Sequence, residues 1–574
     1  MTLLRSSSNR FDEVLVTAES SDPANGLVAV RLRDIYAGLL LSLPGLLIFF
    51  RSAFTSGFDK IMGNVGDARL QIYGHEHWLE VLRGRVSWTS PEFFYPTKGV
   101  LGYSDTFLLN EVFYLPLRAS GMDEFLAFQW TFVLMCLIGF VATFILCRQV
   151  FRFTMMRSAA LSTILVFSNA LYVKSGHLQL YSLFWVPVLL LLVWQGMHAR
   201  KRKQAMAWST GAGIFLGLLF FSTYYIAWFT CCAALIYTVI LAALRFPELR
   251  VRGIITALRD RAAVICAFVI GFAVAMVPFV ITYLPILRSS GGRRYQDAML
   301  YAARPLDIVN LGGTNYVWGS TMRAMLATPR LANNEVSLAI TPVLMACVLA
   351  SVGFAWFMRR RGGGTFADSA IAFGITTIAL ILLPVRFSFG SLWRIPWTLV
   401  PGAIGIRAID RIALLAGPCA VLAISCALCV LDRRASSAPS SRRLGLVVGL
   451  LLAVVVLEQL NLGETSQIDR SEQIKALVEA GSPPSGCRSF YVTDSSGAPY
   501  YEVTIDAMMI SQHLNIPTLN GYSGQFPDGF TFLDPNAPTY IDQVHSWALV
   551  HNITHGLCSF DRMTHVWSQD TSGS

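Results

Sequence analysis

Long apolar runs recur along most of this chain, from Asp34 to Asn461, and they restrict its possible folds more than any other feature. A helix needs about 20 predominantly apolar residues to cross the roughly 30 Å hydrocarbon core of a membrane. We therefore expect about eleven transmembrane helices. Their approximate ranges are 34–50, 124–147, 158–173, 178–197, 205–222, 224–244, 262–286, 336–358, 367–383, 412–431 and 444–461.

The composition supports a membrane protein over a soluble one. Of the 574 residues, 54% are hydrophobic and only 14% are charged, against about 25% charged in an ordinary soluble domain. An ordinary soluble enzyme is therefore excluded. The formal net charge of +10 would suggest nucleic-acid binding in a soluble protein. Here membrane topology explains the excess, and we predict no nucleic-acid partner.

The distribution of Lys and Arg predicts the orientation, because these residues are retained on the cytoplasmic side during insertion. An N-inside, C-outside arrangement places the basic short loops in the cytoplasm, together with a tail at 1–32. The segments 51–123, 287–335, 384–411 and 462–574 then lie outside. The basic inner loops contain Arg148, Arg152 and Arg157; 200–203; Arg245, Arg250, Arg252, Arg259 and Arg261; 359–361; and Arg433, Arg434, Arg442 and Arg443.

The region 462–574 alternates helix-like and strand-like stretches, which is typical of a small α/β domain. We therefore predict an all-α polytopic membrane domain at 33–461 followed by a C-terminal α/β extracytoplasmic domain. The helix-like stretches are 472–480, 503–514 and 540–551, and the strand-like ones are 488–492 and 557–560.

Two of the 11 cysteines stand apart from the apolar spans. Cys487 and Cys558 each adjoin a predicted strand of the outer region. An oxidising compartment would allow them to pair, so we predict a disulfide, with two free thiols as the alternative.

The first outer segment carries the strongest candidate for chemistry, Asp67. Gly63 and Gly66 precede it, and the residues beyond it suggest an amphipathic helix at the membrane surface. A carboxylate at that junction can meet a lipid-linked substrate and an aqueous acceptor, as a general base must. The alternative is that Asp67 merely caps the helix.

Further polar residues outside the membrane are candidates for substrate binding. Asp105 lies among aromatic residues and could orient a sugar hydroxyl, or it could belong to a turn in an interfacial aromatic belt. His177 and Gln179 interrupt an apolar run, which favours a cavity lining or an interfacial helix cap.

Basic residues in the outer segments, among them Arg386 and Arg394, work against the retention bias and therefore need a reason. Arg407 and Arg411 would share one face of a helix and could clamp a phosphate, and Arg293 and Arg294 are further candidates for the same role. Attraction to anionic lipid headgroups is the alternative.

Metal and nucleotide signatures are absent from the sequence. His75-Glu76-His77 lacks the spacing of a metal-binding helix, and a solvated surface explains it better. There is no Asp-x-Asp signature, phosphate-binding glycine loop or serine-nucleophile elbow. We predict no metal site and no firm cofactor, because a divalent metal has no support.

Several short motifs, taken together, resemble bacterial multi-spanning glycosyltransferases of the GT-C class. The resemblance covers most of the chain. The motifs are Gly66-Asp67, 102–105, 176–180, 407–411 and 520–524.

This resemblance implies a polyprenyl-phosphate-linked sugar donor, transfer on the outer face of the bacterial cytoplasmic (inner) membrane, and an essential acidic residue in the first outer loop. Asp67 is the matching position. Many relatives pair two acidic residues there, whereas Gly66 precedes Asp67 here and the nearest acidic neighbours are Asp59 and Glu76.

The resulting hypothesis is an inverting hexosyl- or pentosyltransferase that acts on a glycolipid, polysaccharide or protein acceptor. Asp67 would take the acceptor proton, the arginines would stabilise the leaving phosphate, and Asp105, His177 and Gln179 would orient the sugar. The alternatives are a transporter or flippase of a lipid-linked glycan, which would bind the same headgroup, and an export or assembly scaffold. Membrane lipids are partners in every case.

Overall fold

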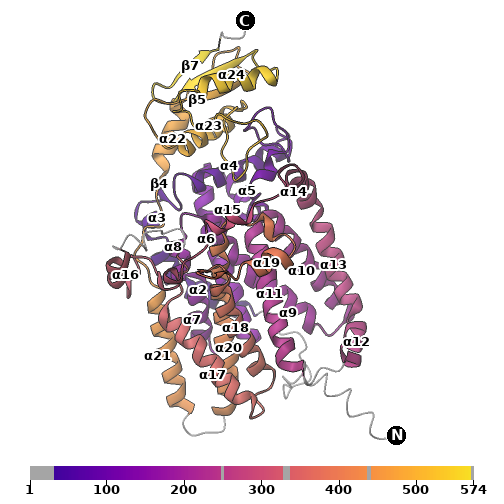
Figure 1. Ribbon diagram of the computed structural model, residues 1–574. Helices are drawn as coiled ribbons and strands as arrows, with labels where there is room; N and C mark the ends of the chain where they lie inside the picture. Colours follow the sequence, from indigo (N-terminus) through magenta and orange to yellow (C-terminus); the bar gives the residue numbers. More distant parts are fainter. Residues whose placement is uncertain (1–30, 247–250, 327–336, 436–440, 571–574) are drawn as a thin grey trace.

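The computed structural model is a bundle of long apolar helices with a small α/β region at one end (Figure 1). It describes residues 31–246, 251–326, 337–435 and 441–570. Within these ranges nine helical segments are long and apolar enough to cross a membrane, or ten if one bent pair counts as a span. The chain is therefore a multi-pass membrane protein. The predicted tail at 1–32 lies outside the described residues except for its last two.

Several of the spans consist of two consecutive helices. The nine segments are α2 (Leu32–Phe49), α6 (Glu124–Gln149), α7 (Met155–Val166) with α8 (Asn169–Val173), η3 (Leu178–Phe184) with α9 (Trp185–His198), α10 (Arg202–Ser222), α11 (Tyr224–Arg245), α17 (Pro342–Arg359), α18 (Gly364–Leu382), and η8 (Ile409–Leu415) with α20 (Ala416–Ala435).

The bent pair is α13 (Ala262–Ala275) and α14 (Val277–Ser290), whose axes differ by 55°. Pro278 is the second residue of α14. Proline lacks an N–H and its ring clashes with the carbonyl four residues earlier, so the helix bends at this point. The short helix α12 (Val251–Asp260) precedes the pair.

The prediction of about eleven spans differs from the structure at the last one. The predicted span at 444–461 corresponds to α21 (Ser441–Gln459), which packs against α7 and α17. Its 19 residues include Arg442, Arg443 and Glu458, which leave an uncharged stretch of only 14 residues between them. A search for apolar runs in the sequence detects the uncharged middle of α21. It therefore counts this helix as an additional transmembrane span.

Side chains on the outside of the bundle are apolar, as a lipid environment requires. Leu40, Val269 and Leu450 are examples of exposed aliphatic residues on α2, α13 and α21. Inside the bundle, aromatic rings such as Phe132 and Tyr181 pack edge to face.

The connection between α2 and α6 gathers at the same end of the bundle as the C-terminal region (Figure 1). Its helix α4 was expected to rest at the membrane surface, and the structure shows that other parts of the protein cover it. The helix packs against α5, α6 and α23, and ten of its 16 residues are buried. The connection contains α3 (Arg51–Thr55), β1 (Lys60–Ile61), α4 (Asp67–Leu82), η1 (Val100–Tyr103), η2 (Leu108–Asn110) and α5 (Glu111–Ala119).

The other connections at this end are built from short elements. They include α15 (Tyr295–Met299), η5 (Pro305–Val309), α16 (Gly319–Leu326), the antiparallel pair β2 (Arg386–Phe387) and β3 (Gly390–Ser391), α19 (Arg394–Leu399) and η7 (Ala403–Gly405).

The C-terminal region is a small α/β unit. In its sheet, β5 (Ser489–Thr493) runs parallel to β6 (Leu557–Asp561), which pairs antiparallel with β7 (Val566–Gln569). The predicted fold class, an all-α polytopic domain with a small C-terminal α/β unit, is confirmed. The unit also contains β4 (Ile468–Asp469), which pairs with β1, and the helices α22 (Arg470–Glu479), α23 (Tyr500–Leu514) and α24 (Tyr540–Val550).

Candidate functional site

Asp67 is the first residue of α4 and leaves the capping of that helix to a neighbour. The side-chain Oδ1 of Asn64 accepts hydrogen bonds from the backbone N–H groups of Gly66 at 3.1 Å and of Asp67 at 2.8 Å. Asn64 therefore satisfies N–H groups that a helix start leaves unpaired. The alternative role of Asp67 as a mere helix cap is not what the structure shows, and its carboxylate is available for other contacts.

A hydrogen bond joins the Asp67 carboxylate to His177. The distance between Asp67 Oδ2 and His177 Nδ1 is 2.6 Å, and the two side chains are 29% and 21% exposed. His177 lies just before η3 in a tight turn, where its backbone N–H donates to the carbonyl of Lys174. The structure thus brings together two residues that are 110 positions apart in sequence.

Gln179 completes this arrangement. Its Oε1 accepts a hydrogen bond from Gln71 Nε2 at 3.0 Å, and its side chain also bonds to Asp67. Gln71 lies one turn after Asp67 on α4, on the same face. His177 and Gln179 therefore contact the proposed base itself, a role that differs from the sugar-orienting one expected from the sequence.

Electrostatics keep Asp67 ionised. Burial alone would raise its pKa, but the hydrogen bond and charge of His177, with smaller contributions from Arg411 and Gln179, hold the pKa below its ordinary value. A carboxylate that stays charged and partly exposed can attract the proton of an approaching hydroxyl.

The positive charge of Arg411 acts on Asp105 as well as on Asp67. Its Oδ1 accepts a hydrogen bond from the backbone N–H of Tyr224 at 3.1 Å. Burial raises the pKa of Asp105 to about 6, and the Tyr224 N–H and the charge of Arg411 oppose that rise. The charge of Arg411 therefore acts on two carboxylates, one with a lowered and one with a raised pKa.

Arg407 and Arg293 form a second positively charged group, in addition to Arg411. The Arg407 guanidinium lies 5.1 Å from the centre of the Tyr301 ring, within cation–π range. Burial lowers the pKa of Arg293, and the nearby charge of Arg407 lowers it further. Arg293 Nη2 also donates to the carbonyl of Gly524 at 3.1 Å.

The proposed arginine cluster differs in two details from the sequence-based expectation. Arg411 lies in η8, a 3-10 helix, and Arg407 precedes that helix, so the two are not one α-helical turn apart. Arg294 is exposed, and its backbone N–H starts α15 by donating to Asp297 Oδ2 at 3.2 Å. The short polar stretch around these arginines gave no periodicity from which either detail could be predicted.

A buried ion pair that the sequence analysis missed connects the two loops of the site. Lys174 Nζ lies 2.8 Å from Asp410 Oδ2, and the side chains are 3% and 2% exposed. Lys174 is three residues before His177, and Asp410 directly precedes Arg411. A lysine in an outer turn was the only available signal, since its partner is 236 residues away.

The His75-Glu76-His77 segment is buried, so the expected solvated surface is wrong. His75 Nδ1 lies 2.5 Å from Glu111 Oε1, and Glu76 binds Tyr114 and Arg118. The covering of α4 by α5 and α6 removes this segment from water. In the described part of the chain, no group of three or more His, Cys, Asp or Glu side chains is arranged to hold a metal ion.

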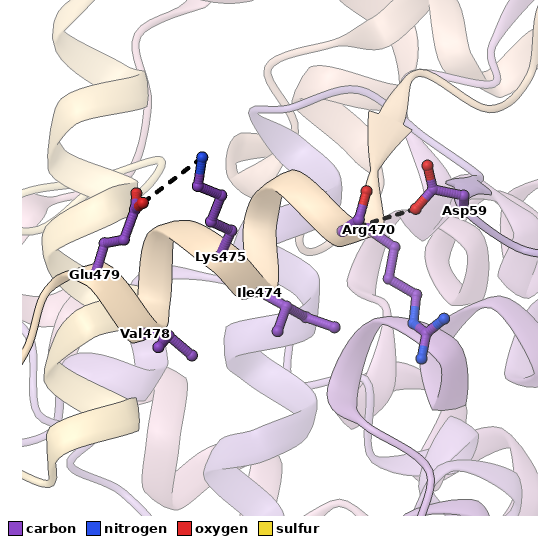
Figure 2. Close-up of a pocket in the computed structure, with 7 residues that line it drawn as sticks. Asp59, Arg470, Ile474, Lys475, Val478 and Glu479 are labelled. Atoms are coloured by element: carbon purple, nitrogen blue, oxygen red, sulfur yellow. Dashed lines mark hydrogen bonds and ion pairs between the residues drawn. The ribbon is translucent and has the colours of Figure 1, made fainter.

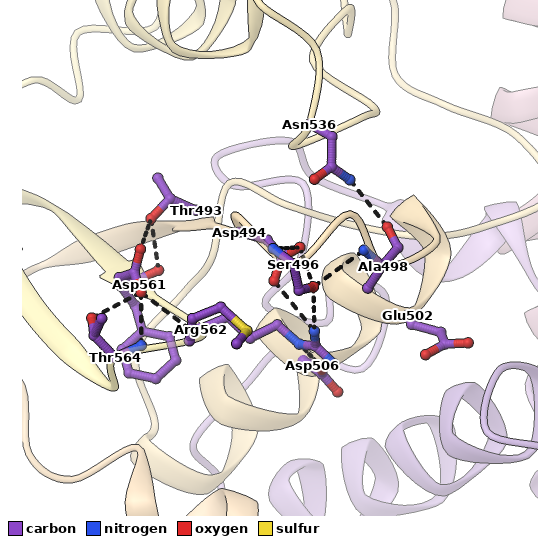
Figure 3. Close-up of polar contacts among 12 residues, drawn as sticks. Thr493, Asp494, Ser496, Ala498, Glu502, Asp506, Asn536, Asp561, Arg562 and Thr564 are labelled. Atoms are coloured by element: carbon purple, nitrogen blue, oxygen red, sulfur yellow. Dashed lines mark hydrogen bonds and ion pairs between the residues drawn. The ribbon is translucent and has the colours of Figure 1, made fainter.

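The C-terminal unit carries a disulfide between Cys487 and Cys558. Their Cα atoms are 5.7 Å apart. The bond joins Cys487, two residues before β5, to Cys558 in β6. An ionic chain also runs through this unit (Figure 3): Arg562 contacts Asp494 at 3.3 Å and Asp506 at 2.5 Å. Asp506 in turn forms an ion pair with Arg69 on α4.

A separate groove lies along α22, where Lys475 and Glu479 form an ion pair at 3.6 Å (Figure 2). Asp59 also lines this groove, and its Oδ1 accepts a hydrogen bond from the backbone N–H of Ser471 at 3.0 Å. None of the residues predicted to act in catalysis or binding lines this groove.

No protein-family model matches the sequence, and a comparison with curated proteins finds no significant match. Among solved structures, the chain is similar to the oligosaccharyltransferase of Archaeoglobus fulgidus in its apo form, at 13% identity and a TM-score of 0.49, over 91% of this chain and 69% of that one. The complex of that enzyme with zinc and sulfate gives 14% identity and a TM-score of 0.46, over 92% and 68% of the two chains. Arabinofuranosyltransferase AftD from mycobacteria gives 14% and 0.44, over 81% of this chain and only 30% of that one.

Proposed function

We propose that this protein transfers a sugar from a polyprenyl-phosphate donor to an acceptor hydroxyl on the outer face of the membrane. The observation that carries the proposal is the Asp67–His177 pair at 2.6 Å beside Arg411, at the end of a bundle of apolar helices. A carboxylate for the acceptor proton and fixed positive charge for a phosphate are what such a transfer needs. Three of the short motifs that resemble GT-C enzymes, Gly66-Asp67, 176–180 and 407–411, contain these residues.

The proposed step is a single displacement. Asp67 accepts the proton of the acceptor hydroxyl while the oxygen of that hydroxyl forms a bond to the anomeric carbon. The bond from that carbon to the phosphate oxygen breaks, and polyprenyl phosphate leaves with the bonding electrons. A single displacement inverts the anomeric centre.

The remaining site residues support this step. His177 and Gln179 hold the carboxylate of Asp67 in place through hydrogen bonds. Arg411, with Arg407 and Arg293 beside it, stabilises the charge that gathers on the leaving phosphate. Asp105 neighbours Arg411 and orients a hydroxyl of the sugar.

The membrane orientation follows from the same proposal. The site lies at the end of the bundle that holds α4, α5 and the C-terminal α/β unit (Figure 1). With the N-terminus inside, this end faces the outer side of a bacterial cytoplasmic membrane. The polyprenyl chain of the donor would lie among lipids while its phosphate reaches the arginines.

The experiment is turnover of a panel of radiolabelled polyprenyl-phosphate hexoses and pentoses, with membrane extract as acceptor. Asp67→Asn should lower release of polyprenyl phosphate by about 10² to 10⁴-fold, the usual contribution of a general base. Asp59→Asn is the matched control, because this carboxylate lies in the same loop but contacts Ser471.

Equal turnover by wild type and Asp67→Asn would remove Asp67 as the base. No turnover by wild type with any donor would contradict the transferase and favour a transporter of the same lipid-linked glycan. All variants need matching expression and thermal stability for these comparisons.

A further inference from the structure

Three tyrosines of the C-terminal unit gather next to the proposed base. The ring centres of Tyr500, Tyr501 and Tyr522 are 6.0 to 6.2 Å apart, and all three side chains are partly exposed. The rings therefore contact one another, and part of each side chain remains accessible to a ligand. We call this group the tyrosine cluster.

The tyrosine cluster lies beside the start of α4, where Asp67 is located. The ring of Tyr501 lies so close to Gly66 that a Cβ atom there would be 3.2 Å from it. The charge of Asp67, after burial, raises the pKa of Tyr522, which reaches about 12. Gly66 thus leaves room for the Tyr501 ring beside the carboxylate, since any larger residue would crowd it.

The cluster is held in this position from three sides. The Arg69–Asp506 ion pair fixes α23, which carries Tyr500 and Tyr501, on α4 two residues beyond Asp67. Ser523 Oγ donates to the carbonyl of Tyr103 at 2.7 Å, and Arg293 donates to Gly524. The Tyr522 loop is therefore attached both to the Asp105 segment and to the arginine group.

We propose that the tyrosine cluster is the acceptor subsite and binds a sugar ring of a glycan acceptor, an inference that rests on the proposed function. Sugar rings present C–H groups on their faces, which pack on aromatic faces, and hydroxyls on their edges, which phenol groups can bond. A lipid or an unglycosylated peptide would not need this combination of partly exposed rings and hydroxyls beside a carboxylate.

The positions of the charges assign the cluster to the acceptor and not to the donor. The base must touch the acceptor hydroxyl, and Tyr501 is in contact with the residue directly before Asp67. Donor phosphate is expected at Arg411, whose charge acts on Asp67, at Arg407, whose charge acts on Tyr522, and at Arg293, which donates to the carbonyl of Gly524. The acceptor sugar would thus lie between the C-terminal unit and α4.

The kinetic test compares Tyr501→Ala and Tyr522→Ala with wild type while donor and acceptor are varied separately. We expect the acceptor KM to rise at least tenfold and the donor KM to stay within twofold. Tyr501→Phe should retain ring stacking and show a smaller acceptor effect than Tyr501→Ala. Tyr316→Ala, an exposed tyrosine before α16, is the control for loss of a surface ring.

A rise in donor KM with an unchanged acceptor KM would overturn the assignment. A direct binding measurement separates this failure from failure of the transferase. Saturation-transfer NMR of purified wild type with methyl glucoside, methyl mannoside and methyl arabinofuranoside should show transfer to at least one glycoside. That signal should be lost in Tyr501→Ala/Tyr522→Ala, and absence of the signal in wild type would also overturn the proposal.

Discussion

At the scale of single residues, the site is defined by contacts that no local pattern contains. The sequence singled out Asp67, His177 and Gln179 separately, and the structure joins them around one carboxylate. Each residue was noticeable because a polar group at the end of an apolar run needs a reason. Their pairing was not predictable, because it depends on how α4 packs against η3.

His177 sets the proton affinity of Asp67, so its replacement should change the pH profile. His177→Asn removes the leading cause that lowers the Asp67 pKa, and the pKa should therefore rise. We expect kcat/KM at neutral pH to fall about ten- to a hundredfold and its acid limb to move to higher pH. The measurement is kcat/KM for sugar transfer between pH 4 and 9. A wild-type acid limb near neutrality that disappears in His177→Asn would place the proton on His177 instead.

The ionised carboxylate of Asp105 should lower the free energy of unfolding at neutral pH. Its pKa of about 6 in the folded protein exceeds the ordinary 3.8, so the folded state binds the proton more tightly than the unfolded state. Protonation of Asp105 therefore stabilises the folded protein as the pH falls from about 6 to about 4. Above pH 6 this stabilisation is absent. Asp105→Asn should raise the free energy of unfolding at pH 7 by about 1 to 3 kcal/mol. Thermal unfolding in detergent at pH 7 and pH 4 checks this, and an equal effect at both values would contradict it.

At the scale of elements, hydropathy predicts the helices well and their surroundings poorly. Runs such as 124–147 and 224–244 reappear as α6 and α11. The α4 helix was also expected, but periodicity shows only that one face is apolar and does not show what covers it. Part of its cover is α23, which is more than 400 residues away in sequence.

The Lys174–Asp410 pair should act as a structural link between α8 and η8. Lys174→Met would leave Asp410 in a buried place without this partner, which usually costs about 3 to 5 kcal/mol. Replacing both, as Lys174→Met/Asp410→Leu, should recover most of the loss because no charge is left buried. Thermal unfolding of the purified variants measures this. A double variant as unstable as the single one would show that the pair is not the source of the effect.

At the scale of the whole molecule, the bundle and the C-terminal α/β unit were predictable in kind. Alternating helix-like and strand-like stretches after residue 462 correspond to α22 to α24 and to β5 and β6. The attachment of this unit to α4 and to Tyr103 was not predictable, because ion pairs and loop contacts between distant segments leave no periodic signal. The tyrosine cluster belongs to this unpredicted part.

The disulfide provides a test of which side of the membrane holds the C-terminal unit. If this unit lies in an oxidising compartment, Cys487 and Cys558 should resist alkylation until they are reduced. We expect peptides of these two cysteines alone, among the 11, to take a second alkylating label added after denaturation, blocking and reduction. Mass spectrometry of protein from intact cells gives the result. Complete labelling of both before reduction would contradict the predicted orientation.

The sharing of Arg411 between Asp67 and Asp105 has a thermodynamic consequence for the donor. With both carboxylates ionised, the charge of Arg411 acts on two negative groups before the phosphate of the proposed donor arrives. Asp105, whose pKa is about 6, can take up a proton and thereby release Arg411 to the phosphate. Binding of the lipid-linked phosphate and proton uptake are then linked equilibria, so an acidic membrane surface would favour a loaded site.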